Sequence, residues 1–130
     1  MADTETRLDD VRACVFDAYG TLFDVTAAAR QCRDALGDDV DHLAEVWRSK
    51  QLQYTWLRAL MGRHRDFWQV TGDALDYAMA SLRIDNSALR QRLMELYLSL
   101  DAYPEVAGVL KRLRKSGMKT AILSNGSPRM

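Results

Sequence analysis

Two polar segments at opposite ends of the sequence carry residue types that could do chemistry. Asp17 directly follows one apolar run and precedes Gly20 and Thr21. Ser124 and Asn125 follow a second apolar run. An aspartate carboxylate is ionised at neutral pH, and partial removal from water makes it a better nucleophile. Because hydroxyl and backbone N–H groups in a turn suit an anion, the pattern predicts a nucleophile and an anion-binding loop, with a simple turn residue as the alternative for Asp17.

Two short strands are expected to bring these segments together. Residues 11–16 and 119–123 are apolar and partly β-branched, and each run ends in a polar loop, which is typical of buried strands. Residues 104–117 predict a helix between them, with Pro in the first turn and Gly at the end. Strand, helix and strand then form a β-α-β unit with parallel strands. Since reactive loops lie at the carboxyl ends of such strands, Asp17 and Ser124 are expected side by side.

The residues between the two strands predict helices inserted after the first strand. The strongest pattern covers residues 41–61, where apolar side chains recur at a period near 3.6 and Gly62 follows. Shorter helices are expected to start near Thr26, near Asp73 and at the Asp85-Asn86-Ser87 cluster, whose residue types can cap a helix. The expected fold is therefore α/β, with a Rossmann-like parallel-sheet core and an inserted helical cap.

The expected domain boundaries follow from this arrangement. Residues 1–25 and 101–130 are assigned to the core, and residues 26–100 to the cap. Two strands alone leave sheet edges and one flank of the core uncovered, which is an aggregation hazard.

The composition fits a soluble globular protein and argues against two classes of partner. Of the 130 residues, 48% are hydrophobic and 28% are charged, which is enough apolar material for a core. Eighteen Lys and Arg balance eighteen Asp and Glu, so no bulk positive field favours nucleic acid. The acidic amino terminus and the absence of a long apolar run predict neither a signal peptide nor a membrane span. Cys14 and Cys32 lack metal-ligand spacing and fit a reduced, cytoplasmic setting.

Three segments in this order resemble the haloacid dehalogenase superfamily. Residues 16–22 (FDAYGTL) resemble its nucleophile motif, and residues 122–126 (ILSNG) resemble its second motif. Residues 47–57 (WRSKQLQYTWL) are similar to the cap of the 2-haloacid dehalogenases. The resemblance implies a two-step hydrolysis, in which an aspartate displaces halide from C2 of a short (S)-2-haloalkanoic acid. Water then cleaves the aspartyl ester and leaves an (R)-2-hydroxyalkanoic acid.

The same resemblance implies five catalytic residues. Asp17 would be the nucleophile, and Thr21 would hold its carboxylate by a hydrogen bond. Arg48 would receive the departing halide, although helical periodicity alone favours an exposed surface arginine at this position. Ser124 and Asn125 would hold the substrate carboxylate through a hydroxyl and a backbone N–H group.

Four further residues are implied to bind substrate. The backbone N–H of Ala18 would contact the substrate carboxylate. Tyr19, Leu52 and Phe67 would line an apolar pocket for the halogenated carbon, which is the environment that an alkyl halide needs. From the residues alone, Leu52 and Phe67 fit core packing at least as well.

Position 19 separates two reactions of this superfamily. Its phosphatases carry a second aspartate two residues after the nucleophile, because an alkoxide leaving group needs a proton and a halide does not. Tyr19 cannot act as that carboxylic acid, so a dehalogenase is favoured over a phosphatase of the same fold. Displacement at carbon needs no Mg²⁺ to spread phosphate charge, so no metal or other cofactor is expected. A non-catalytic helical interaction fragment is the remaining alternative, since much of the chain is cap.

Members of the family continue beyond the second motif and carry a lysine there that neutralises the two carboxylates. These 130 residues are therefore expected to be an amino-terminal portion that is poorly active or inactive alone. The resemblance also implies a homodimer packed through cap helices. Trp47, Trp56 and Trp68 are the candidate anchors of that dimer.

Overall fold

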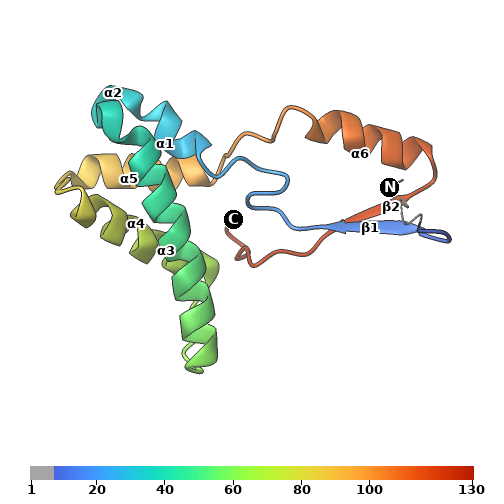
Figure 1. Cartoon of the computed structure of the whole chain (residues 1–130), viewed down its shortest axis with the longest axis horizontal. Helices are drawn as coiled ribbons and strands as arrows, with labels where there is room; N and C mark the ends of the chain where they lie inside the picture. Colours follow the sequence, from blue (N-terminus) through green and yellow to red (C-terminus); the bar gives the residue numbers. More distant parts are fainter. Residues whose placement is uncertain (1–7) are drawn as a thin grey trace, which may run out of the picture.

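The first and last strands of the chain pair with each other in the computed structural model, which describes residues 8–130 (Figure 1). Strand β1 (Ala13–Phe16) lies parallel to β2 (Lys119–Ile122), and helix α6 (Val106–Lys115) returns the chain between them. The N–H of Leu123 donates to the carbonyl of Phe16 at 2.8 Å, so the pairing continues past the end of β2. The predicted β-α-β unit with parallel strands is confirmed.

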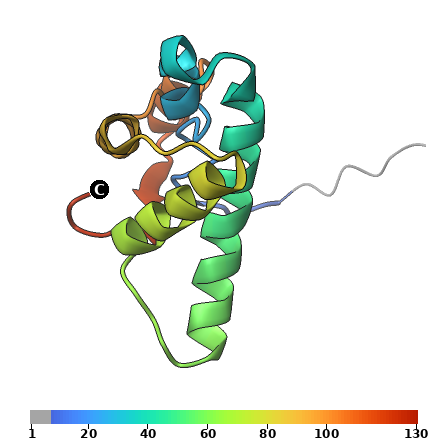
Figure 2. The same ribbon diagram turned by 90° about the vertical axis from the view of Figure 1, so that its left-hand side faces the viewer.

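The intervening chain forms a second group of elements, named here the helical body, which lies beside the β-α-β unit (Figure 1). Its longest helix turns one flank toward the other helices and leaves its far end projecting (Figure 2). The elements are α1 (Ala27–Gln31), α2 (Arg33–Leu36), the 3₁₀ turn η1 (Gly37–Asp39), α3 (Val40–Leu60), α4 (Phe67–Ser81) and α5 (Ser87–Tyr97). The expected helical insertion after the first strand is therefore present.

The starts of α4 and α5 test the predicted caps. The predicted Asp85-Asn86-Ser87 cluster starts α5, and within it the structure selects Asn86, whose side-chain oxygen accepts the Leu89 N–H at 2.9 Å. For α4 the prediction of Asp73 is wrong, because Asp66 accepts the Gln69 N–H at 3.1 Å and starts the helix earlier. Asp73 lies inside α4, where its carboxylate pairs with Arg58 of α3 at 2.8 Å.

The first predicted helix is broken rather than continuous. Helices α1 and α2 meet at Cys32, whose N–H bonds to the carbonyl of Ala29 and tightens the turn there. The Thr26 side chain makes no capping bond to α1, because its hydroxyl donates to the Asp24 carboxylate at 2.7 Å. Thr26 therefore occupies the predicted N-cap position of α1, but its side chain makes no capping bond to the helix.

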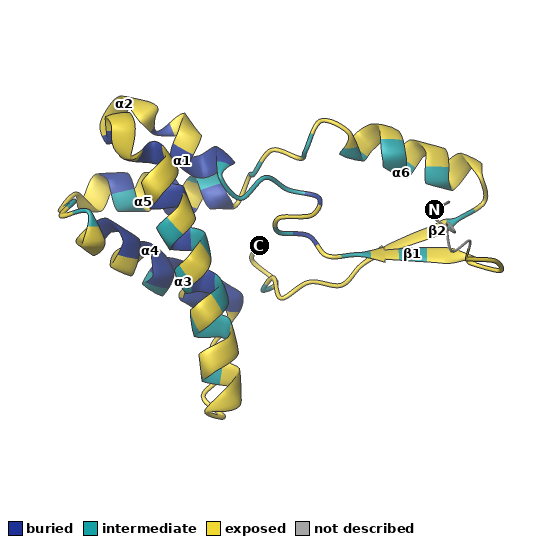
Figure 3. Cartoon of the chain, in the orientation of Figure 1, coloured by how far each residue is buried: buried dark blue, intermediate teal, exposed yellow. Residues whose placement is uncertain are grey.

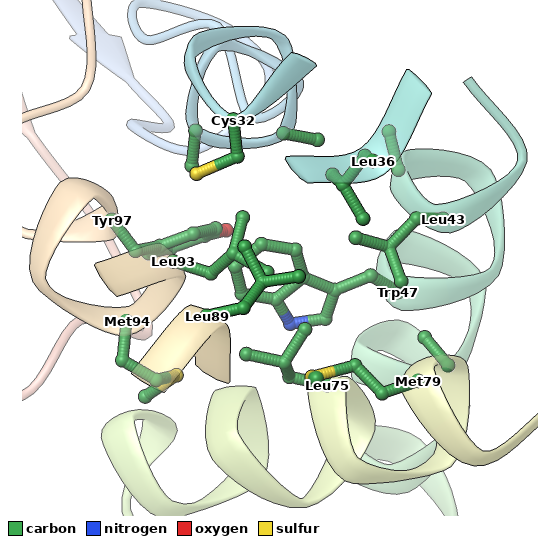
Figure 4. Close-up of a cluster of buried hydrophobic side chains, with 14 of the residues drawn as sticks. Cys32, Leu36, Leu43, Trp47, Leu75, Met79, Leu89, Leu93, Met94 and Tyr97 are labelled. Carbon is green, nitrogen blue, oxygen red and sulfur yellow. The ribbon is translucent and has the colours of Figure 1, made fainter. Parts of the chain in front are cut away.

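The helical body encloses the buried hydrophobic cluster of the described residues (Figures 3 and 4). Leu43, Leu75 and Leu93 contribute side chains from three different helices and are fully buried. Trp47 packs among them, and its Nε1 donates to the carbonyl of Thr71 at 2.9 Å. Trp47 is therefore a core residue, and its prediction as a dimer anchor is wrong because no surface of it is free to reach a partner.

The β-α-β unit, in contrast, buries little (Figure 3). Strand β2 is exposed along its length, and α6 has no buried residue. Val15 keeps 62% of its surface exposed and Ile122 keeps 59%. The prediction of buried strands is wrong for the described residues, whereas the expected uncovered flank of the sheet is confirmed.

Helix α3 also extends past its partners. Its first half packs in the core, but Leu57 and Leu60 near its end are 53% and 85% exposed, as is Met61 just beyond it at 62%. The apolar stripe predicted over residues 41–61 is therefore buried only in its amino-terminal part. Within residues 8–130, no helix combines the length and the hydropathy that a bilayer span needs.

Two crossing segments join the helical body to the β-α-β unit. The Asp24 N–H donates to the carbonyl of Asp101 at 2.8 Å, and the Tyr103 N–H donates to the carbonyl of Leu22 at 3.0 Å. Between these bonds the two segments run antiparallel. The entry to the helical body and the exit from it are therefore tied together. Residues 1–7, which the sequence assigns to the core, lie outside the described residues.

Candidate active site

A pocket of about 110 Å³ lies where the carboxyl end of β1 meets α3 and the start of α4. Most of the residues predicted to form the site line this pocket. The lining residues are Asp17, Tyr19, Arg48, Leu52, Thr55, Trp56, Phe67 and Asn125. Residues far apart in the sequence, from the β-α-β unit and from the helical body, are thus brought to one place.

The two largest hollows on the helical body contain none of the predicted catalytic or substrate-binding residues. One of about 430 Å³ lies around Arg83 and Arg90 at the turn from α4 to α5. Another of about 530 Å³ lies between α4 and α5 beside Trp68. Neither brings a carboxylate nucleophile together with the loops that end the strands, so the smaller pocket is the candidate site.

Asp17 sits directly after β1, where the strand opens into a tight loop. The Thr21 hydroxyl donates to its Oδ2 at 3.3 Å, which is the contact predicted for this pair. The Ala18 carbonyl accepts the N–H groups of Leu22 and Phe23 at 2.9 and 3.0 Å and closes the loop. Asp17 itself is exposed to solvent. Within residues 8–130, its carboxylate therefore lacks the partial removal from water that the sequence predicts.

Arg48 reaches from α3 to the loop that follows Asp17. Its Nη1 donates to the Oε1 of Gln51 at 2.8 Å, and its Nη2 donates to the carbonyl of Tyr19 at 2.9 Å. Gly20 leaves room for this contact, since a Cβ there would lie 3.0 Å from the arginine Nη2. The alternative of an exposed surface arginine is therefore wrong. A half-buried cation faces the same pocket as the Asp17 carboxylate.

An aromatic wall closes one side of the pocket. The ring of Tyr19 stacks on Tyr97, with centroids 5.6 Å apart, and contacts Phe67 at 5.4 Å. Burial raises the pKa of the Tyr19 phenol, so this side chain stays neutral near physiological pH. Tyr19, Leu52 and Phe67 all line the pocket. Phe67 is also buried, so it serves both as a pocket residue and in core packing.

The loop that contains Ser124 and Asn125 lies beside the loop that follows Asp17, but only one of these two residues reaches the pocket. Asn125 lines the pocket, whereas Ser124 does not. The Ser124 hydroxyl accepts the Gly126 N–H at 3.0 Å within its own turn. Gly126 approaches the Tyr19 ring, since a Cβ at this glycine would lie 3.3 Å from Tyr19 Cε2. The two loops are therefore adjacent, as expected, and the substrate contacts of Ser124, Asn125 and the Ala18 N–H stay predictions.

A buried polar group behind the pocket is absent from the sequence-based prediction. Gln51 is only 1% exposed, and its Nε2 donates to the Thr71 hydroxyl at 2.8 Å and to the Tyr97 hydroxyl at 3.0 Å. Burial raises the pKa of Tyr97 to about 12, against smaller opposing effects from Gln51 and Arg48. One signal is visible in the sequence, because Gln51 lies one helical turn after Trp47 on the apolar face.

Comparison with known proteins places this geometry in a family. A family model described as hydrolase, haloacid dehalogenase-like hydrolase, matches residues 11–130. (S)-2-haloacid dehalogenase 1 of Pseudomonas sp. (strain CBS-3) is 47% identical over 124 residues, which are 95% of this chain and 55% of that protein. The chain thus spans about half the length of the relatives it matches.

Solved structures share the fold at similar coverage. A dehalogenase crystal structure superposes with a TM-score of 0.90 at 44% identity, over 95% of this chain and 55% of that one. The L-2-haloacid dehalogenase of Xanthobacter autotrophicus, solved with chloropropionic acid covalently bound, gives a TM-score of 0.79 at 46% identity, over 91% and 48%. These similarities confirm the predicted α/β class, with a Rossmann-like core and a helical cap. The chain belongs to the haloacid dehalogenase-like hydrolase family.

Proposed function

We propose that this chain supplies the nucleophile and the halide site of an (S)-2-haloacid dehalogenase. In the first step, an Asp17 oxygen attacks C2 of a short (S)-2-haloalkanoic acid, and the carbon–halogen bond breaks as halide leaves with its electron pair. In the second step, water attacks the Asp17 Cγ, and the acyl–oxygen bond of the ester breaks. The (R)-2-hydroxyalkanoic acid keeps the oxygen that Asp17 contributed, and Asp17 regains one oxygen from water as a proton is released.

The observation that carries this proposal is the shared pocket of Asp17 and Arg48. Negative charge develops on the halogen only as the bond breaks, so a cation held nearby stabilises the transition state more than the substrate. Tyr19, Leu52 and Phe67 provide an apolar wall for the alkyl part of the substrate. The relatives named above are themselves called 2-haloacid dehalogenases, which supports the same substrate class.

Tyr19 favours this reaction over phosphate hydrolysis. Burial raises the pKa of its phenol, and it offers no carboxylic acid to protonate an alkoxide. We therefore expect metal-free halide release and no metal-dependent hydrolysis of a phosphate monoester such as p-nitrophenyl phosphate. The expectation that no metal or other cofactor is needed stays a prediction for this assay to test.

The 130 residues alone are expected to release little halide. Among the described residues that line the pocket, none is a lysine. Two carboxylates, one from Asp17 and one from substrate, would repel each other with Arg48 as the main cation. We therefore also consider a hybrid, in which this chain continues into the part of (S)-2-haloacid dehalogenase 1 that it does not cover. The hybrid should release halide far faster than the chain alone.

The covalent route is tested with the hybrid in heavy-oxygen water under single-turnover conditions. Mass spectrometry should find the label in the peptide that contains Asp17 and none in the 2-hydroxy acid. Label in the hydroxy acid, with none in Asp17, would mean direct attack by water and would overturn the proposal. Asp17→Asn should remove halide release, whereas the matched change at the exposed Asp38 should leave it intact.

We further propose that residues 26–100 are the cap and that residues 1–25 and 101–130 are the core. We also propose that the protein is cytoplasmic and forms a homodimer. The exposed end of α3 supports the dimer, because Trp56, Leu57 and Leu60 form an apolar surface there. Trp68 is a weaker anchor, since Arg129 lies 4.7 Å above its ring. Leu60→Lys should convert the dimer to a monomer in sedimentation velocity, and an unchanged dimer would exclude this surface.

A further inference from the structure

We propose that Gln51 and Tyr97 are positioning residues that hold Arg48 in the orientation needed to receive halide. The inference rests on the proposed function, because it concerns the same site. It adds a fixed support behind the halide-binding cation, made of buried side chains that do not line the pocket.

The Arg48 guanidinium is held at two points. Its Nη1 donates to Gln51 within α3, and its Nη2 donates to the Tyr19 carbonyl in the nucleophile loop. A guanidinium is planar, so two fixed nitrogen atoms fix the plane and the direction of the remaining N–H groups. A long arginine side chain otherwise has several rotamers of similar energy. The two acceptors therefore select one orientation beside the pocket.

The Gln51 amide cannot turn over without losing its hydrogen bonds. The Thr71 hydroxyl donates to the Phe67 carbonyl at 2.6 Å, so it can only accept from Gln51. The Gln51 NH₂ group must therefore face Thr71, and its Oε1 must face Arg48. In the reversed orientation, the NH₂ group would face the N–H donors of Arg48 in a site that is closed to water. The acceptor for Arg48 is thus fixed by the buried neighbours of Gln51.

Tyr97 supports both acceptors of Arg48 from α5. Its hydroxyl bonds to the Gln51 amide, and its ring stacks on Tyr19 at 5.6 Å with 19° between the planes. On another side the ring contacts Trp47 at 5.2 Å, which connects it to the core. Loss of the Tyr97 hydroxyl should loosen the Gln51 end, whereas the stacked ring should keep the Tyr19 end in place. Tyr97→Phe is therefore a mild and specific perturbation.

Leaving-group dependence separates positioning from stability. Chloride is a poorer leaving group than bromide, so its release depends more on stabilisation of the departing charge. In the hybrid, single-turnover rates should be measured with 2-chloropropionate and 2-bromopropionate. Gln51→Met should lower the chloride-to-bromide rate ratio about tenfold, and Tyr97→Phe should lower it by about threefold. Gln53→Met, at an exposed position of the same helix, should leave the ratio unchanged.

A loss of folded protein would lower both rates together and would leave their ratio as it was. A ratio that stays constant in Gln51→Met and Tyr97→Phe would therefore overturn the inference, even if activity fell. A hybrid that releases no halide at all would instead overturn the proposed function.

In that second case the positioning is still tested in the 130-residue chain by NMR of the Arg48 guanidinium. Separate Nη1 and Nη2 signals in the parent chain that merge in Gln51→Met would support the positioning. Signals already merged in the parent chain would overturn it.

Discussion

The helical body and the β-α-β unit use similar apolar residues with opposite results. In the helical body, Leu75 and Leu93 are fully buried because the apolar faces of α3, α4 and α5 meet each other. In the β-α-β unit, Leu123 stays 75% exposed, because α6 lies along the sheet and leaves apolar side chains of the strands uncovered. Hydrophobic patterning thus indicates which face of an element can be buried, and only the arrangement of partners determines whether it is.

The candidate site combines these two environments. Arg48 comes from the packed helical body, where buried neighbours fix it. Asp17 comes from the exposed unit, where one hydroxyl contacts its carboxylate. The cation is therefore expected to be more rigid than the nucleophile in this chain. Mutation and pH titration test this contrast between the two regions.

Matched leucine truncations should show the largest difference between the two regions. Leu75→Ala should lower the free energy of unfolding by about 2–5 kcal/mol, since it leaves a cavity in a close-packed core. Leu123→Ala should change it by less than about 0.5 kcal/mol, because the side chain is mostly in water. Urea unfolding followed by far-UV circular dichroism measures both. Equal losses would mean that the contrast in burial does not exist in solution.

Alkaline pH should weaken the helical body through Tyr97. Burial raises the pKa of Tyr97 from 10.0 to about 12, because the folded state disfavours the ionised phenolate. The contribution of the neutral phenol to the free energy of unfolding is therefore fully present below pH 10 and is lost as pH rises to about 12. The shift corresponds to an effect of about 3 kcal/mol. Unfolding free energies measured from pH 9 to pH 12 should fall more steeply in the parent chain than in Tyr97→Phe. Parallel curves would show that the Tyr97 hydroxyl is not buried.

Two glycines separate backbone strain from a specific contact at the boundary of the regions. Gly20 and Gly62 both have positive φ, at 87° and 67°, so alanine should cost about 1–2 kcal/mol at either position. Only at Gly20 would the new Cβ meet Arg48 Nη2, at 3.0 Å. Gly20→Ala should therefore also slow single-turnover chloride release by the hybrid, whereas Gly62→Ala should not. An equal rate in both variants would argue against the Arg48 contact.

Acid pH should have the smallest effect, at the junction between the regions. Burial raises the pKa of Asp24, but hydrogen bonds from Arg30 and Thr26 outweigh it and hold the pKa below the ordinary 3.8. The stabilisation is therefore present above pH 3.8 and is lost as pH falls below it. Since Arg30 is half-exposed, we expect less than about 1 kcal/mol. Unfolding free energies from urea titrations should be measured between pH 5 and acid pH. They should fall less with decreasing pH in Asp24→Asn than in Asp38→Asn, and an identical fall in both variants would show that Asp24 makes no net contribution.

Local signals in the sequence account for much of the fold and of the site. The strand pair, the start of α5 at Asn86 and the contact between Thr21 and Asp17 each depend on residues close together in sequence or on a topological rule. Asp66 and Asp73 are equally good caps by residue type, but in the folded chain Phe67 directly after Asp66 is buried and Asp73 pairs with Arg58. Sequence reasoning therefore performs best where one turn or one ladder determines the outcome.

The support behind Arg48 could not be predicted in the same way. Gln51, Thr71 and Tyr97 come from three helices, and their hydrogen bonds exist only after those helices pack. The burial of Trp47 likewise depends on α4 lying across its indole. A polar residue on an apolar helix face is a useful signal, but its partner is set by tertiary structure.

The paired crossing segments have a practical consequence for exchanging parts between related enzymes. Because the Asp24 N–H bonds to the Asp101 carbonyl, both ends of the helical body lie within one hydrogen bond of each other. A segment with adjoining ends can be transplanted into another scaffold without stretching the chain on either side. The helical body, with Arg48 and the buried Gln51 amide behind it, is thus a natural module for grafting onto a different sheet.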